Sequence, residues 1–243
     1  MPKERVEKRH EVRLVKYSER HWRLLEAKRR EALAILEALE KAGIHAVVHG
    51  SIARGDVHEG SDIDVFIPYV VPSYIVEIAL EKAGYHPTHK LIVQATPHST
   101  PKAYIVLDIE EKRVVSFPLA KLSRTEYEFY FFGGALDADG LRRAQRVPGV
   151  DKRLMLIEPV PEGHRESSVL GREAEAARII GISVDTVLER VHVLTRRDEH
   201  GRTGVFVKAE IGPTDSIEEA VKSLARSNPV FRRALVEKNS PLL

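Results

Sequence analysis

The sequence predicts a mixed α/β (α+β) core followed by a smaller, α-rich C-terminal domain. Helical and strand patterns alternate over roughly the first half of the chain, and a pair of short helical patterns occupies residues 171–208. The 243 residues, 43% of them hydrophobic and 30% charged, are typical of globular proteins with a sizeable core. We therefore expect a domain over residues 1–120 and a second one over residues 121–243.

A long helix is expected over residues 18–43. Trp22, Leu25, Leu36 and Leu39 recur near helical spacing, and Gly43 ends the pattern. Two short strands follow, over residues 44–50 and 61–69, and a second helix is expected over residues 72–85.

The next segment predicts strands and then another helix. Residues 90–96 read as a strand, and residues 102–119 as a hairpin that turns at Glu111–Lys112. Ser123, with Glu126 three residues later, forms the pattern of a capping box, so a new helix is expected there. A mixed sheet with helices follows from this order of elements.

Composition excludes several classes of protein. The absence of cysteine excludes disulfides, thiolate catalysis and cysteine-based zinc sites. The charged start and the absence of a long apolar run predict a cytoplasmic protein without membrane partners, and the high charge with two methionines fits a thermophile. Residues 1–30 carry eleven Lys or Arg against five Glu, although the net charge is only +2.

Two aspartates, Asp62 and Asp64, are one residue apart in the second predicted strand. Side chains alternate along a strand, so both carboxylates are expected on one face while Ile63 and Val65 enter the core. Neighbouring carboxylates repel each other unless a cation lies between them, and hard oxygen ligands select Mg²⁺ or Mn²⁺. The pair therefore predicts a metal site.

A small-residue turn precedes the aspartates. Gly50 and Ser51 follow a strand and open a brief helix, where backbone N–H groups and a hydroxyl can bind phosphate. The whole stretch, VVHGSIARGDVHEGSDIDVFI with Ser61 before the aspartates, resembles the polymerase-β-like nucleotidyltransferase superfamily. The resemblance covers roughly the first half of the chain.

The resemblance implies a third carboxylate on a later strand and a site for two metal ions. Asp108 ends an apolar strand and is the expected third ligand, with Glu110 as the alternative. Ser51 and Arg54 would then contact the triphosphate, although Arg54 could instead pair with Asp56 or Glu59.

The C-terminal half contains a pattern similar to a winged helix-turn-helix at residues 171–208. Two helical stretches meet at Gly181–Ser183, and a hairpin is expected near His200–Gly201. Arg190, Arg196, Arg197, Arg202 and Lys208 could touch the phosphates of RNA or DNA, or could lie in water beside a simple helical hairpin.

The sequence as a whole thus predicts a metal-dependent nucleotidyltransferase that moves a nucleoside monophosphate from a nucleoside triphosphate to an acceptor hydroxyl, for which RNA is the first candidate. Two alternatives stay open: a nucleic-acid-binding regulator with an idle nucleotidyltransferase fold, and an antitoxin-like enzyme that modifies protein hydroxyls.

Overall fold

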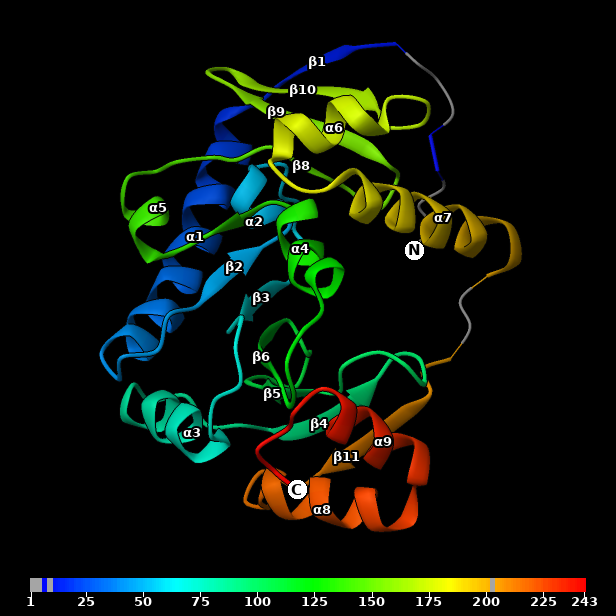
Figure 1. Cartoon of the computed structure of the whole chain (residues 1–243). Coiled ribbons are helices and arrows are strands. Elements are labelled where there is room, and N and C mark those ends of the chain that lie inside the picture. The colour runs from blue at the N-terminus through cyan, green and yellow to red at the C-terminus, as the bar shows by residue number, and fades with distance from the viewer. Residues whose placement is uncertain (1–5, 8–10, 202–203) are drawn as a thin grey trace. The chain divides into compact units, whose positions relative to one another are not determined.

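A computed structural model describes residues 6–7, 11–201 and 204–243 (Figure 1). The chain forms two compact units, each assembled from three separate segments. Unit 1 comprises Met1–Glu31, Val48–Ser61 and Tyr127–Thr203, and unit 2 comprises Ala32–Val47, Asp62–Glu126 and Gly204–Leu243. Most of the basic N-terminal stretch before residue 11, and Arg202, lie outside the described residues.

Unit 2 is built on a sheet with the strand order β11, β4, β5, β6, β3. The bounds of these strands are β3 Ile63–Phe66, β4 His89–Gln94, β5 Lys102–Val106, β6 Arg113–Pro118 and β11 Val207–Ile211. The sheet is mixed, because β3 runs parallel to β6 whereas the other pairs are antiparallel. Its helices are α3 (Ser73–Lys82), α8 (Ile217–Ser227) and α9 (Pro229–Glu237).

One row of side chains that runs across the strands of unit 2 is fully buried. Val65, Val115 and Ile105 lie opposite one another in register and are fully buried. Lys90 continues this row on β4, and its buried ammonium group donates to Glu77 on α3 at 2.8 Å. The same ammonium group donates to the Asp215 carbonyl at 2.6 Å, so a carboxylate and a carbonyl together offset part of the cost of its burial.

Unit 1 contains a four-stranded antiparallel sheet with the order β1, β10, β9, β8. The strands are β1 Arg13–Lys16, β8 Gly149–Val150, β9 Met155–Val160 and β10 Gly163–Ser168. Val48 and His49 of β2 (Val47–His49) belong to this unit and pair with β7 (Ala135–Leu136). The unit also holds α2 (Ser51–Arg54), α5 (Ala138–Arg142), α6 (Glu173–Ile180) and α7 (Val184–His200).

Two helices contribute residues to both units. They are α1 (Glu19–Glu40), which ends before Gly43 as predicted, and α4 (Arg124–Phe132). The predicted capping box of α4 is confirmed: Ser123 Oγ accepts from the Glu126 N–H at 3.3 Å, and the Glu126 carboxylate accepts from the Ser123 N–H at 2.9 Å. The predicted β5–β6 hairpin is confirmed as well.

The two units divide the chain differently from the linear boundary at residue 120 that the sequence predicts. Strand β11 pairs with β4, so residues 204–243 join the sheet formed by residues 62–126. Strand β1 pairs with β10, so the start of the chain joins unit 1. Long-range strand pairing of this kind leaves no mark in local composition.

The prediction of an α-rich C-terminal domain is corrected by the β9–β10 hairpin. Residues 155–168, although they contain Pro159 and Pro161, form two paired strands. Four polar residues of β10 are buried, and two of them show how they are paired: His164 Nδ1 lies 2.7 Å from Tyr17 Oη, and Glu166 accepts from Arg153 at 2.9 Å. Because these partners satisfy polar side chains, hydrophobic alternation does not reveal the strand.

The helix-turn-helix region agrees with the prediction only in part. Helices α6 and α7 meet at the expected turn, where Gly181 has a φ of 82° and the Ser183 side chain caps α7. The predicted winged hairpin is wrong, because α7 continues to His200 and β11 pairs with β4 of unit 2. Without a wing, these helices form a helical hairpin on the core of unit 1.

None of the helices among the described residues has the length and apolar character that a membrane-spanning segment needs.

Candidate functional site

The paired aspartates lie at the start of β3 in unit 2. Ile63 and Val65 are buried, so the alternation of the strand places Asp64 on the opposite face. Asp64 is half-buried, whereas Asp62, directly before the strand, is exposed. The Ile63 N–H, between the two carboxylates, donates to the carbonyl of Lys112 and so fixes this part of the strand to β6.

The sheet face that carries Asp64 also carries a tyrosine. Asp64 lies opposite Val114 on β6. Two residues further along β3, Phe66 lies opposite Ser116 on β6, which in turn lies opposite Tyr104 on β5. Burial, with a further contribution from the negative charge of Asp64, raises the pKa of Tyr104 to about 12. The Tyr104 hydroxyl therefore keeps its proton at neutral pH.

Asp108, the predicted third ligand, lies in the turn between β5 and β6. Its Oδ1 accepts from the Lys112 N–H and its Oδ2 from Arg113 Nε, both at 2.9 Å. Burial opposes ionisation, but these hydrogen bonds and the Arg113 charge lower the pKa of Asp108 below its ordinary value. Glu110, the alternative ligand, is exposed and pairs with Lys112.

Among the residues that the structure describes, no three His, Asp or Glu side chains gather closely enough to hold a metal ion. The oxygen donors of Asp62 and Asp64 nevertheless have the chemistry that Mg²⁺ or Mn²⁺ prefers. The role of Asp108 as third ligand stays a prediction, and the contacts that the structure assigns to its carboxylate close the β5–β6 turn.

The predicted phosphate turn lies in unit 1. Gly50 has a φ of 83°, a conformation that favours glycine, and its N–H donates to the Gly134 carbonyl at 2.9 Å. Helix α2 begins directly afterwards with Ser51. The Ser51 and Ser61 hydroxyls are 3.1 Å apart, and Ser61 Oγ also accepts from the His58 N–H at 3.0 Å. Ser51 and Ser61 therefore join the two ends of the loop.

Arg54 is buried with an exposure of 5%, and it takes the pairing that the sequence left open. Its Nε and Nη2 donate to both carboxylate oxygens of Asp56, at 2.9 and 2.8 Å. Its Nη1 donates to the Gly133 carbonyl at 2.6 Å. These contacts favour a structural role, and the contact between Arg54 and a phosphate stays a prediction.

Three side chains of α1 contact backbone carbonyls in residues 51–61, and the sequence did not predict these contacts. Arg29 donates to the carbonyls of Ile52 and Ala53, each at 3.0 Å. Lys28 Nζ donates to the Ser61 carbonyl at 2.6 Å, and His21 Nε2 lies 2.8 Å from the Gly55 carbonyl.

A signal for Arg29 does exist in the sequence. Leu25, Arg29, Ala32 and Leu36 follow the spacing of a buried helix face, so Arg29 is the charged member of an apolar stripe. Burial, with the nearby Arg146 charge, lowers the pKa of Arg29 to about 10, so the side chain still carries its charge at neutral pH.

Comparison with known proteins supports the resemblance that the motif suggests. Residues 29–120 match the family model of the nucleotidyltransferase domain. No curated protein and no solved structure matches the chain. The matched segment contains Asp62 and Asp64, the Gly50–Ser51 turn and Arg29.

Proposed function

We propose that this protein is a metal-dependent nucleotidyltransferase, which transfers a nucleoside monophosphate from a nucleoside triphosphate to an acceptor hydroxyl. The observation that carries the proposal is the position of Asp64 on β3, opposite the core face and one residue from Asp62, within the segment that matches a nucleotidyltransferase domain. Asp-x-Asp alone is a common surface pattern, whereas its place after a Gly-Ser turn is specific.

The residues divide the work by their chemistry. Asp62 and Asp64, with Asp108 as the expected third ligand, would hold Mg²⁺ or Mn²⁺ through carboxylate oxygens. The bound ion would neutralise phosphate charge and lower the pKa of the attacking hydroxyl. The N–H groups of the loop at Gly50 and the hydroxyls of Ser51 and Ser61 would donate to the triphosphate oxygens.

The transfer itself forms one bond and breaks another. The acceptor oxygen bonds to the α-phosphorus while the bond from this phosphorus to the bridging oxygen breaks, pyrophosphate leaves, and the hydroxyl proton passes to water. The contribution of the protein is to position the triphosphate and to offset its charge. RNA is the proposed acceptor, on the strength of the exposed Arg196 and Arg197 at the end of α7.

The contacts of Asp108 favour a second candidate, a nucleic-acid-binding regulator whose nucleotidyltransferase fold is idle. A carboxylate already bound to Arg113 and to the Lys112 N–H has fewer lone pairs left for an ion. This candidate predicts that nucleotide binds without turnover.

An experiment with a labelled α-phosphate separates these candidates and identifies the acceptor. Each nucleoside triphosphate is incubated with the protein, Mg²⁺ and, in separate reactions, total RNA, DNA or protein. Label in RNA supports the proposal, and label in protein supports the antitoxin-like alternative. Retention of nucleotide on the protein with no labelled product in any pool supports the idle fold.

A further inference from the structure

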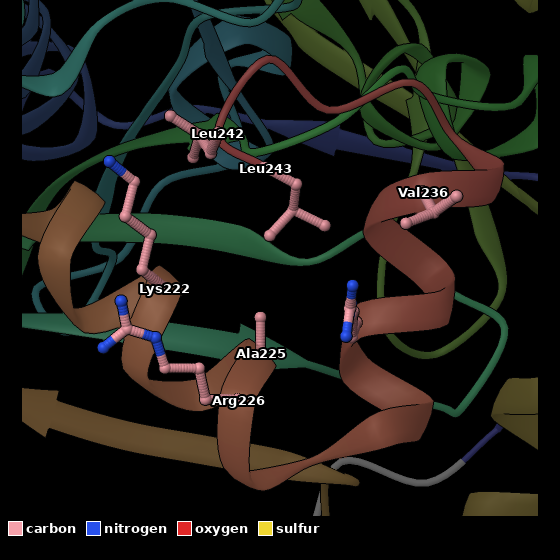
Figure 2. Close-up of a pocket in the computed structure, with 7 residues that line it drawn as sticks. Lys222, Ala225, Arg226, Val236, Leu242 and Leu243 are labelled. Carbon is pink, nitrogen blue, oxygen red and sulfur yellow. The ribbon is translucent and has the colours of Figure 1, made fainter.

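The C-terminal helices of unit 2 enclose a pocket that the nucleotidyltransferase proposal does not use. Its volume is about 360 Å³, within the range of roughly 300–1,000 Å³ that is usual for ligand pockets. Figure 2 shows Ala225 on α8, Val236 on α9, and Leu242 and Leu243 of the last segment around it. These four side chains give the pocket an aliphatic wall.

Two of these aliphatic side chains are open to solvent. Val236 is 58% exposed and Leu243 is 53% exposed, whereas Ala225 is buried at 4% and forms part of the base. Apolar surface that gathers around a hollow, with charged side chains at its rim, is typical of interaction sites. The same residues scattered singly over the surface would need no such explanation.

Three cations line the same pocket: Lys222 and Arg226, one turn apart on α8, and Arg232 on α9. All three are exposed, and none forms an ion pair with another residue that the structure describes. No acidic side chain lines the pocket. The pocket thus combines an aliphatic wall with three cations that are available to a ligand.

We propose that this pocket binds an acidic peptide segment of a partner protein. One aliphatic side chain of the peptide enters between Ala225, Val236 and Leu243, and carboxylates on either side of it pair with Lys222, Arg226 and Arg232. Arginine at the rim of an apolar pocket is a common arrangement at protein interfaces, because the guanidinium group binds carboxylates with two parallel hydrogen bonds.

The walls favour a peptide over a polynucleotide. Single-stranded nucleic acid is usually bound by aromatic side chains on which bases stack, and none of the residues that line this pocket is aromatic. An aliphatic wall matches an aliphatic side chain instead.

The test uses the whole protein and a fluorescein-labelled peptide in which a leucine pair is flanked by glutamates. Fluorescence anisotropy should show saturable binding to the wild type. Arg232→Glu should weaken binding about tenfold, because an attraction becomes a repulsion, whereas Arg233→Glu, the exposed neighbour that does not line the pocket, should leave the affinity unchanged. Val236→Asn, at an exposed position of α9, tests the aliphatic wall without adding charge and should weaken binding as well.

Other results overturn the proposal. Equal affinity for a peptide with serines in place of the leucines would show that charge alone is bound. Equal losses in Arg232→Glu and Arg233→Glu would show that the helix, and not the pocket, is the contact. Binding of labelled oligouridylate that Arg232→Glu abolishes, with no binding of the peptide, would assign the pocket to RNA. Circular dichroism checks that each variant is folded.

Discussion

The carbonyl oxygen of Ala53 accepts a hydrogen bond of 3.0 Å from the guanidinium group of Arg29. Ala53 lies in α2, the short helix that begins at Ser51, and the same guanidinium group also binds the Ile52 carbonyl. Arg29 thus fixes the end of α2 that lies away from the proposed phosphate turn, and it adds positive charge beneath a loop that would bind a triphosphate.

Replacement of Arg29 by Gln should weaken triphosphate binding about tenfold and cost about 1–3 kcal/mol of stability, because two carbonyls lose a charged donor. Arg30→Gln is the matched control, since the adjacent Arg30 is exposed and pairs with Glu26 on the same helix. Titration with a fluorescent triphosphate and thermal melts measure both effects. If Arg29→Gln and Arg30→Gln bind alike, Arg29 has no role in positioning the loop.

Asp62→Asn and Asp64→Asn should each abolish metal-dependent triphosphate binding while the fold is kept. The neutral amide cannot replace a carboxylate as a ligand of a hard cation, and loss of a direct ligand should lower affinity at least about 100-fold. Asp62 is exposed and Asp64 half-buried, so neither change opens a cavity in the core. Calorimetry in Mg²⁺ and in EDTA measures the effect, and affinity that does not depend on the ion refutes the metal site.

Asp108→Asn distinguishes a ligand from a turn residue. If Asp108 holds an ion, transfer should be lost while nucleotide binding decreases only slightly, since the proposed role of this residue concerns the attacking hydroxyl. Its pairing with Arg113 also predicts a loss of about 1 kcal/mol of stability. Glu110→Gln is the control. Should Glu110→Gln stop transfer and Asp108→Asn leave it intact, Glu110 is the third ligand.

The features that the sequence predicts correctly are those that depend on neighbouring residues in the chain. The capping box at Ser123 and the β5–β6 hairpin depend on neighbours in the chain, and both are confirmed. The pairing of β1 with β10 and of β11 with β4 joins segments that are distant in sequence, so local pattern does not reveal it. Arg54 shows the same limit, because its partner Gly133 is 79 residues away.

Stability should decrease in acid through Glu126. Burial alone would raise the pKa of this carboxyl, but the hydrogen bonds from Lys238, Thr100 and Ser123 lower it to about 2. A carboxyl with a depressed pKa stabilises the fold above its unfolded pKa of about 4.5, and this contribution is lost as the pH falls from 4.5 towards 2.

In Glu126→Gln, the stability measured by urea unfolding should therefore change less steeply with pH between 4.5 and 2. Glu237→Gln, at an exposed carboxylate on α9, is the control. An unchanged slope in Glu126→Gln would show that other carboxylates dominate acid unfolding.

If α7 contacts RNA, Arg196→Ala together with Arg197→Ala should weaken polynucleotide binding. Each lost phosphate contact should flatten the dependence of log affinity on log salt by about 0.7 for a single strand, because fewer counterions are released. Triphosphate affinity should stay unchanged. Arg172→Ala, which removes a pair with Glu175, is the control. A lower melting temperature with unchanged RNA binding would mean that the two arginines serve packing.

The most direct measurement of the central claim compares two labels in one transfer assay. The protein is incubated with Mg²⁺, total RNA and a nucleoside triphosphate labelled at either the α- or the γ-phosphate, in the wild type and in Asp64→Asn. A nucleotidyltransferase transfers the α-label to the acceptor and releases the γ-label in pyrophosphate, and Asp64→Asn should do neither. Transfer of the γ-label, or equal transfer by Asp64→Asn, would contradict the assignment of the β3 carboxylates to nucleotidyl transfer.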